Sequence, residues 1–281
     1  MIFKFRILTF LIILLFIYSC GDKVDNKKIV LQNTDLEKQM IEAYKKGVEA
    51  LDQGDVLYAT KNFNVAEKLF PQSIWASRSI IMSAYAYYSQ DYYGDAMYEL
   101  KRFLKSYPNS EYVPYASYLL ALCYYEKIED EKRDSGSLLN AKKNFEELIV
   151  NYPKTDFSID AKYKILLIDN LLASKELYVA KYYLDKKKWI PAINRLKEIT
   201  EKYDETIYIE EALHRLVEVH YKIGLVSESK KYAKLLGYNY QSGKWYKETY
   251  RIFNKDYMSE NEKIKKKKSS AVIKKLKSIF N

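Results

Sequence analysis

Apolar residues recur with helical spacing through Tyr178–Ile199, the stretch around which the rest of the chain is organised. In its first half, Val179, Tyr182 and Tyr183 fall on one stripe. In its second half a matching stripe is formed by Trp189, Ile193, Leu196 and Ile199. A short basic turn, Asp185–Lys188, separates the two halves, so the pattern predicts two helices folded back on each other. One such hairpin cannot bury both of its faces, and we therefore expect it to be one unit of a stack.

Three earlier helical patterns end in a similar tripeptide, and this reveals the repeats. They close at Leu69–Pro71, Ser106–Pro108 and Asn151–Pro153. Counting back from each proline gives small and large residues at shared offsets, as in tetratricopeptide repeats: Gly47, Ala59, Phe63 and Ala66; Ala84, Tyr87, Ala96, Leu100 and Phe103; Ala121, Tyr124, Ala141, Phe145 and Leu148. The third unit fits with an insertion at Glu129–Ser137. The hairpin above is a fourth unit, and a degenerate fifth starts near Ile209. The sequence thus predicts an all-α fold, an α-solenoid of about five tetratricopeptide-like helix hairpins.

The same pattern divides the chain into five parts. Residues 1–19 have the character of a signal peptide, and residues 20–33 are a polar, aperiodic tether. Thr34 and Glu37 match a capping box, so the helical body is expected to start there, with repeats 1–3 in residues 34–157. Residues 158–253 are expected to hold repeats 4–5. Ser158–Lys187 lacks Gly and Pro and predicts one long helix that joins the two halves. Residues 254–281 form a lysine-rich tail.

The first twenty residues carry a targeting signal. Lys4 and Arg6 precede the apolar run Ile7–Tyr18, which is shorter than the roughly 20 residues of a comfortable membrane span. A plain N-terminal anchor helix is one interpretation. The end of the run, Ile17–Cys20, resembles a bacterial lipobox, in which the cysteine becomes the lipid-modified first residue. We therefore expect a covalent lipid on Cys20 and no other cofactor. By resemblance to bacterial sorting rules, Gly21 in the next position implies the outer membrane.

The formal net charge of +10 is concentrated at the two ends of the chain. Lys4 and Arg6 lie at one end, and residues 254–281 hold nine Lys against three acidic residues at the other. The body between them is nearly neutral, which argues against a nucleic-acid partner. The tail has two interpretations. It is a solvated, disordered end, or it is a basic helix whose apolar stripe, from Ile273 to Phe280, touches an anionic membrane or an acidic partner.

The sequence offers no convincing catalytic or metal-binding constellation. His214 and His220 are six residues apart, so on a helix they face different directions, and the offset of His220 indicates a packing role. Cys123 lies inside a helical pattern and is expected to be a small buried residue. Gly243 and Lys244 lack the remaining glycine and hydroxyl residue of a phosphate loop. We therefore predict that the protein is not an enzyme.

A groove lined by tyrosines is the main candidate binding site. In tetratricopeptide solenoids the first helix of each repeat lines the concave face. The repeat register places the following residues there: Tyr44, Val48, Arg78, Ile81, Tyr85, Tyr88, Tyr115, Tyr118, Leu122 and Tyr125. Such a surface suits an extended peptide with aromatic side chains, and Arg78 could pair with a terminal carboxylate. The alternative is that about half of these tyrosines only pack between repeats.

The ordered combination of a lipobox, repeats, a long helix and the fourth-unit signature resembles the BamD family of outer-membrane assembly lipoproteins. The residues that carry the signature are Tyr178, Val179, Ala180, Tyr182, Tyr183, Trp189, Asn194, Arg195 and Leu196. Tyr85–Tyr88 and Tyr107–Ser110 also resemble family segments, and Gly237–Tyr246 is similar to a version seen in alphaproteobacterial members. The resemblance covers about residues 20–245.

This resemblance implies a lipid-anchored scaffold on the periplasmic face of the outer membrane that promotes assembly and insertion of β-barrel proteins. Its implied partners are a BamA-like barrel subunit, other lipoproteins of the complex, and C-terminal segments of unfolded outer-membrane proteins. The candidate docking residues for the barrel subunit are Trp189, Arg195, Tyr221 and Lys222. Lys222 stands where the family often has Arg. Lysine keeps the positive charge but cannot make the two parallel hydrogen bonds that a guanidinium donates to a carboxylate. The alternative is a periplasmic repeat lipoprotein that coordinates cell-envelope or cell-division enzymes.

Overall fold

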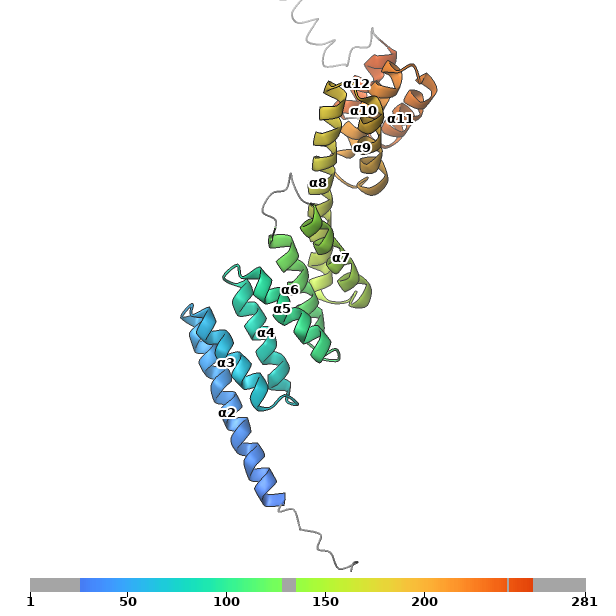
Figure 1. Ribbon diagram of the computed structural model, residues 1–281. Coiled ribbons are helices and arrows are strands. Elements are labelled where there is room, and N and C mark those ends of the chain that lie inside the picture. The colour runs from blue at the N-terminus through green and yellow to red at the C-terminus, as the bar shows by residue number, and fades with distance from the viewer. Residues whose placement is uncertain (1–25, 128–134, 242, 255–281) are drawn as a thin grey trace, which may run out of the picture. The chain divides into compact units, whose positions relative to one another are not determined.

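The structure is a computed structural model that describes residues 26–127, 135–241 and 243–254, with side chains from residue 35 onward. Every regular element in these ranges is a helix, which confirms the predicted all-α fold (Figure 1). In chain order the helices are α2 (Asn26–Asp52), α3 (Val56–Leu69), α4 (Ile74–Tyr88), α5 (Tyr93–Ser106), α6 (Val113–Glu126), α7 (Gly136–Asn151), α8 (Asp156–Asp185), α9 (Trp189–Lys202), α10 (Ile209–Lys222), α11 (Val226–Asn239) and α12 (Lys244–Phe253). The signal peptide, Cys20, most of the predicted insertion and residues 255–281 of the tail lie outside the described residues.

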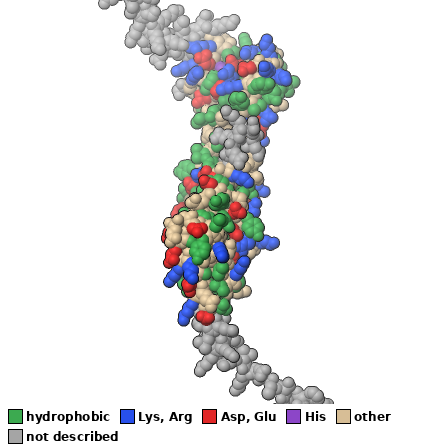
Figure 2. All heavy atoms as spheres, turned by 60° about the vertical axis from the view of Figure 1, so that its left-hand side comes forward, with side chains coloured by type: hydrophobic (Ala, Val, Ile, Leu, Met, Phe, Trp, Pro, Cys, Tyr) green, Lys and Arg blue, Asp and Glu red, His purple; other side chains and the backbone are tan. Residues whose placement is uncertain are grey.

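The predicted hairpins α2 and α3, α6 and α7, α8 and α9, and α10 and α11 are packed pairs, and α12 is an additional helix. No helix within the described ranges is both long enough and apolar enough to cross a bilayer. On the face drawn in Figure 2, Lys and Arg side chains alternate with Asp and Glu rather than forming a large patch of one sign. This agrees with the nearly neutral body inferred from the sequence.

The chain divides into two compact units, one ending at Gln90 and the other beginning at Asp91. The boundary expected from the sequence, between residues 157 and 158, differs from this division. The reason is α8, which packs against both α7 and α9 and so binds the third and fourth helix pairs into one unit.

The first unit, α2 to α4, is held together by interlocking small and aromatic residues. Phe63 of α3 is fully buried, and a Cβ atom built on Gly47 of α2 would lie 2.7 Å from its ring. The backbones of α2 and α3 can approach this closely because position 47 has no side chain. Asp55 and Ser73 cap α3 and α4 by accepting hydrogen bonds from backbone N–H groups of the first turn.

The second unit, α5 to α12, repeats this packing at the predicted offsets. Ala96, Leu100 and Phe103 of α5 are fully buried, and so are Ala141 and Phe145 of α7. The aliphatic positions of α9 behave in the same way, since Leu196 and Ile199 have no exposed surface. The repeat register derived from the sequence therefore identifies the core correctly.

The predicted long helix is present as α8, which has 30 residues and starts two residues earlier than expected. Its N-cap is Thr155, whose hydroxyl accepts a hydrogen bond from the N–H of Ser158. Its C-terminal turn ends at Lys187, which adopts a left-handed conformation with φ of 57°. At 1.5 Å per residue a helix of this length extends about 45 Å.

Two helix boundaries differ from the predictions. The helix expected to start at Thr34 already includes Asn26, so residues 26–33 of the expected tether are helical. These residues contain neither Gly nor Pro, and nothing in them stops a helix that the following apolar pattern sustains. The glycines and aromatic residues of Gly237–Trp245 predict a turn that packs back on the last helices, but Gly237 lies within α11, which continues to Asn239. The element that packs back on α10 and α11 is the helix α12.

Candidate binding surfaces

In the first unit the predicted groove residues fall into two groups. Tyr44 is half-buried, and its ring meets Phe63 edge-on at 5.5 Å and Trp75 at 5.2 Å, so it joins α2 to α3 and α4. Ile81 is 6% exposed and belongs to the core, contrary to the prediction that it faces a ligand. Val48 also packs against the cluster around Phe63. Tyr44, Val48 and Ile81 lie on the sides of α2 and α4 that pack against neighbouring helices, so they hold the helices together.

The exposed part of the predicted surface in this unit lies on α4. Tyr85 has 41% of its side chain exposed, and Tyr88, one turn later, is half-buried. Arg78 lies over the ring of Trp75, with its guanidinium carbon 5.3 Å from the ring centroid. A cation held on an aromatic face keeps its charge and is oriented, so α4 presents aromatic and cationic groups on neighbouring turns.

In the second unit the predicted groove tyrosines pack against α8. The Tyr118 hydroxyl donates a hydrogen bond of 2.6 Å to Asp160, and its ring stacks on Phe157 at 5.3 Å. Tyr115 contacts the same Phe157 ring at 5.5 Å, and Lys164 lies over Tyr125 at 5.1 Å. Leu122 is buried as well. For Tyr115, Tyr118 and Tyr125 the interpretation that fits the structure is packing between repeats.

A cavity of about 260 Å³ between α8, α9 and α10 brings together two of the four predicted docking residues, Trp189 and Lys222. Leu184 and Val219 supply its other apolar walls, and the charged residues around it are Lys181, Asp185, Arg215 and Glu218. Trp189 lies at the start of α9 and Lys222 at the end of α10, so residues 33 positions apart in the sequence share one site. The cavity thus combines an indole with several charges.

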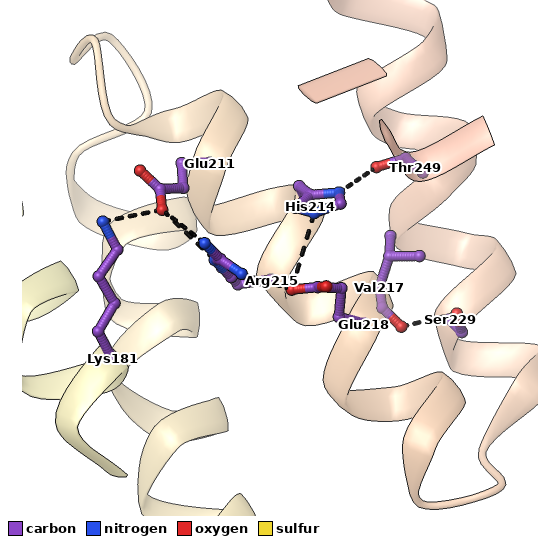
Figure 3. A network of polar contacts seen from close by, with 8 residues as sticks. All are labelled: Lys181, Glu211, His214, Arg215, Val217, Glu218, Ser229 and Thr249. Atoms are coloured by element: carbon purple, nitrogen blue, oxygen red, sulfur yellow. Dashed lines mark hydrogen bonds and ion pairs between the residues drawn. The ribbon is translucent and has the colours of Figure 1, made fainter. Parts of the chain in front are cut away.

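The charges around this cavity form an ordered network, drawn in Figure 3. Glu211 accepts an ion pair from Lys181 of α8 at 2.8 Å and another from Arg215 at 3.2 Å. Arg215 also pairs with Glu218 at 2.8 Å. Burial lowers the pKa of Arg215, but the hydrogen bonds and charges of Glu218 and Glu211 outweigh this effect and raise it. The guanidinium therefore stays charged and fixed in place beside the cavity.

Helix α12 supports this network from the other side. The guanidinium carbon of Arg215 lies 5.3 Å from the centroid of the Trp245 ring, and the His214 ring lies 5.0 Å from the same indole. His214 Nδ1 and the Thr249 hydroxyl share a hydrogen bond of 2.8 Å, and His214 Nε2 is 3.7 Å from Glu218 (Figure 3). Burial lowers the pKa of His214, so the neutral imidazole is favoured. His214 is thus a packing residue that links α10 to α12.

The other two predicted docking residues lie apart from this cavity. Arg195 of α9 pairs with Glu176 of α8 at 3.0 Å and does not line the cavity. Its partners Glu176 and Glu198 line a second cavity of about 490 Å³ on α7, α8 and α9. Tyr221 is 42% exposed and meets Phe253 of α12 edge-on at 5.6 Å. The structure therefore brings Trp189 and Lys222 together in this cavity, whereas Arg195 and Tyr221 point to other surfaces.

Sequence reasoning missed Lys181, Arg215, Glu218 and Trp245. A signal for part of the network was available, because Arg215 follows Glu211 by four residues and precedes Glu218 by three, which is ion-pair spacing on a helix. Trp245 could not be found in this way, since its contact depends on the position of α12. No group of His, Cys, Asp or Glu suited to a metal ion occurs among the residues that the structure describes.

The second histidine and the described cysteine also have packing roles. His220 is buried, and its Nδ1 lies 2.7 Å from the carbonyl oxygen of Leu216. Cys123 is fully buried, and burial raises the pKa of its thiol to about 12. A thiol with so little thiolate at neutral pH is a poor nucleophile. Both residues match the packing roles expected from the sequence.

Comparison with known proteins adds the family. Residues 36–235 match the family model described as YfiO, outer membrane lipoprotein. The chain is 35% identical over 242 residues to the outer membrane protein assembly factor BamD of Rickettsia prowazekii, covering 86% of this chain and 94% of that protein. It is 34% identical over 236 residues to the BamD of Caulobacter vibrioides, covering 84% of this chain and 76% of that protein.

Among solved structures, the TPR2AB domain complex of yeast Sti1 aligns with 75% of this chain and 81% of its own, at 12% identity and a TM-score of 0.40. A TM-score this low supports no conclusion, so the repeat assignment rests on the helix pairs and their buried positions. The family model spans most of the described helices, and the two curated relatives are matched over more than two thirds of their length. The chain therefore belongs to the BamD family of outer-membrane protein assembly factors.

Proposed function

We propose that this chain is a non-enzymatic scaffold that promotes the assembly and insertion of β-barrel proteins into the outer membrane. It is anchored by a lipid on Cys20 and faces the periplasm, where it joins a complex with a BamA-like barrel subunit and other lipoproteins. The family assignment supports the assembly role and does not favour the alternative, a coordinator of cell-envelope enzymes. The lipobox resemblance of Ile17–Cys20 supports the anchor.

The docking site for the barrel subunit is the cavity between α8, α9 and α10. The observation that carries this proposal is that Trp189 and Lys222, two of the four docking residues predicted from the sequence, line the same cavity. Lys181 and Arg215 are already neutralised by Glu211 and Glu218. By contrast, no acidic residue in the described part of the chain pairs with Lys222. Lys222 is thus available for a carboxylate of the partner, while Trp189 offers an apolar surface beside it.

Client segments bind at the exposed side of α4. Tyr85 and Tyr88 supply aromatic surface, and Arg78 supplies a positive charge about two to three turns earlier. An unfolded β-barrel segment with an aromatic end and a terminal carboxylate is complementary to both features. The proposal covers this unit alone, because Tyr115, Tyr118 and Tyr125 are engaged with α8.

The test of the docking site is a pull-down of the lipid-anchored chain from detergent-solubilised outer membranes, with the barrel subunit measured by quantitative mass spectrometry. Lys222→Glu reverses the charge at the cavity, and we expect at least fivefold less barrel subunit. Lys230→Glu is the matched control, because Lys230 is an exposed lysine on α11 and does not line this cavity. Both variants must melt at the wild-type temperature by circular dichroism.

The possible results separate the parts of the proposal. Recovery of no barrel subunit by the wild-type chain would exclude the assembly role. Equal recovery by wild type and Lys222→Glu would exclude the docking cavity but leave the assembly role intact. The anchor is tested by Cys20→Ser, which should abolish incorporation of radiolabelled palmitate and move the chain from the membrane to the soluble fraction. Unchanged labelling in this variant would refute lipidation at Cys20.

A further inference from the structure

One face of α8 carries exposed apolar residues along its first half. Ile159, Tyr163, Leu166 and Leu167 are 55%, 66%, 40% and 50% exposed, and we call them the α8 stripe. Their spacing of three and four residues places them on one side of the helix over about two turns. Large apolar side chains exposed together in this way are unusual on a surface that only meets water.

The same face of α8 turns toward the next repeat along its second half. The spacing that joins Ile159, Tyr163 and Leu166 leads on through Asn170 to positions 177, 181 and 184. Leu177 is 3% exposed, Lys181 pairs with Glu211 of α10, and Leu184 lines the cavity shared with α10. The helical face that is bare in the first half of α8 is therefore the face that meets its neighbours in the second half.

Asn170 marks the point at which this change occurs. Its side-chain oxygen accepts a hydrogen bond of 3.2 Å from the N–H of Ile207, in the loop that leads into α10. Its side-chain amide donates to the carbonyl oxygen of Leu166 at 2.8 Å. The loop before α10 thus crosses α8 at Asn170, and α10 starts two residues after Ile207 and continues toward Lys181. Ile207 itself is 80% exposed and extends the apolar surface at this end.

The other sides of the first half of α8 are occupied by the preceding repeat. Ser158 donates hydrogen bonds to the carbonyl oxygens of Leu148 and Tyr152, at the end of α7. Asp160 accepts from Tyr118 of α6. Among the residues that the structure describes, this half of α8 therefore has the previous repeat on one side and no repeat on the other, because its unusual length carries α9 and α10 to its second half.

We infer that the α8 stripe is a docking face for one amphipathic helix of a partner protein, which lies beside the first half of α8 on the side that faces α10 in the second half. The stripe is continuous with the side of α8 that reaches α10 through the Lys181–Glu211 ion pair and the cavity between the two helices. From Ile159 to Asn170 the face is about 16 Å long, which corresponds to a partner segment of about 11 residues, or three turns.

The charges next to the stripe specify the partner further. Asp156 and Lys162 are the exposed charged residues at neighbouring helical positions, one of each sign. A weakly charged helix with apolar residues at i, i+3 or i+4, and i+7 is complementary to this surface. An anionic membrane surface is not, because membrane-binding faces are rich in Lys and Arg. The inference therefore commits to a protein helix.

The test uses photo-crosslinking of the full-length, lipid-anchored chain in living cells of its source. A photoreactive amino acid replaces Tyr163 in one experiment and Leu167 in another, and Val150 of α7, which is 77% exposed, is the control position. We expect crosslinks from 163 and 167 to one polypeptide and none to that polypeptide from 150. Mass spectrometry must locate them in a weakly charged segment with the apolar spacing of an amphipathic helix.

A second variant makes the result quantitative. Leu166→Asp, combined with the photoreactive residue at 163, should reduce the crosslink at least tenfold, and Val150→Asp should leave it unchanged. Both substitutions are on exposed positions, and thermal melting confirms that the chains remain folded. Crosslinks to lipid, to a second copy of this chain or to its own C-terminal segment would each overturn the inference. So would an absence of crosslinks at 163 and 167, or a crosslink that Leu166→Asp does not reduce.

Discussion

Gly47→Ala is the substitution that most directly tests the packing of the first repeat. The added Cβ would lie 2.7 Å from two atoms of the Phe63 ring, closer than such contacts occur in real proteins. Phe63 is fully buried between α2 and α3, so its ring cannot turn into solvent. Either the ring or the two helices must shift to accommodate the methyl group.

The size of the effect follows from two opposing contributions. Overpacking of a buried site costs about 1–3 kcal/mol. Replacing Gly by Ala inside a helix stabilises it by up to about 1 kcal/mol. Gly94→Ala in α5 provides the second contribution alone, because no atom lies within 4 Å of a Cβ built there. We therefore expect Gly47→Ala to have a lower free energy of unfolding than Gly94→Ala by about 1–3 kcal/mol, with the difference isolating the clash.

The assay is equilibrium unfolding in urea, followed by the fluorescence of Trp75, which contacts Tyr44 in the first unit. Trp189 and Trp245 are replaced by Phe in the Gly47→Ala chain and its parent, so that the signal reports on the first unit. Gly94→Ala lies in the second unit and is followed by the fluorescence of Trp189 and Trp245 in a chain that carries Trp75→Phe, and each change in stability is taken against its own parent. Phe63→Leu should relieve part of the clash, so its destabilising effect should be smaller in the Gly47→Ala chain than in wild type. Equal stability of Gly47→Ala and Gly94→Ala would refute the close approach of α2 and α3.

Two further predictions concern titratable groups. Burial raises the pKa of Cys123 to about 12, so we expect the folded chain not to react with a maleimide at pH 8 and the chain unfolded in urea to react fully. The reaction is measured by mass spectrometry on a Cys20→Ser chain. Rapid labelling of the folded chain would contradict the burial. Burial lowers the pKa of His214, so as the pH falls below about 6.5 the unfolded chain binds a proton first and the free energy of unfolding decreases. His214→Gln should lose this part of the pH dependence in urea titrations followed by Trp245 fluorescence between pH 7.5 and 5.5, and identical pH slopes would exclude it.

The core of the repeats could be predicted from the sequence because local spacing determines it. Phe63, Leu100 and Phe145 occupy the same offset in three repeats, and all three are fully buried. The long helix could be predicted for the same reason, since an uninterrupted apolar pattern without Gly or Pro has few alternatives. These features depend on positions within one helix or one hairpin.

The binding surfaces were harder to predict because they depend on what lies across from each helix. Spacing places Tyr118 on a particular side of α6, but its partner Asp160 is 42 residues further along the chain. Tyrosine also fits both roles, since its ring packs and its hydroxyl hydrogen-bonds. Arg215 likewise needs Trp245 on α12 to hold it beside the cavity. Periodicity defines the angle of a residue on its helix, and only tertiary packing defines its neighbour.

The number of residues in α8 determines the angle, measured about the α8 axis, between the repeat that packs on its first half and the repeat that packs on its second half. Each residue turns the helix by about 100°, so one residue inserted near Ala173 would rotate α9 and α10 by that angle about the α8 axis and advance them by about 1.5 Å. Insertion of seven residues would return them to within about 20° of the original direction. Within the second unit, the number of residues in α8 therefore sets the angle between the directions in which the third and fourth repeats project from this helix. Insertions that keep this angle should add whole helical turns.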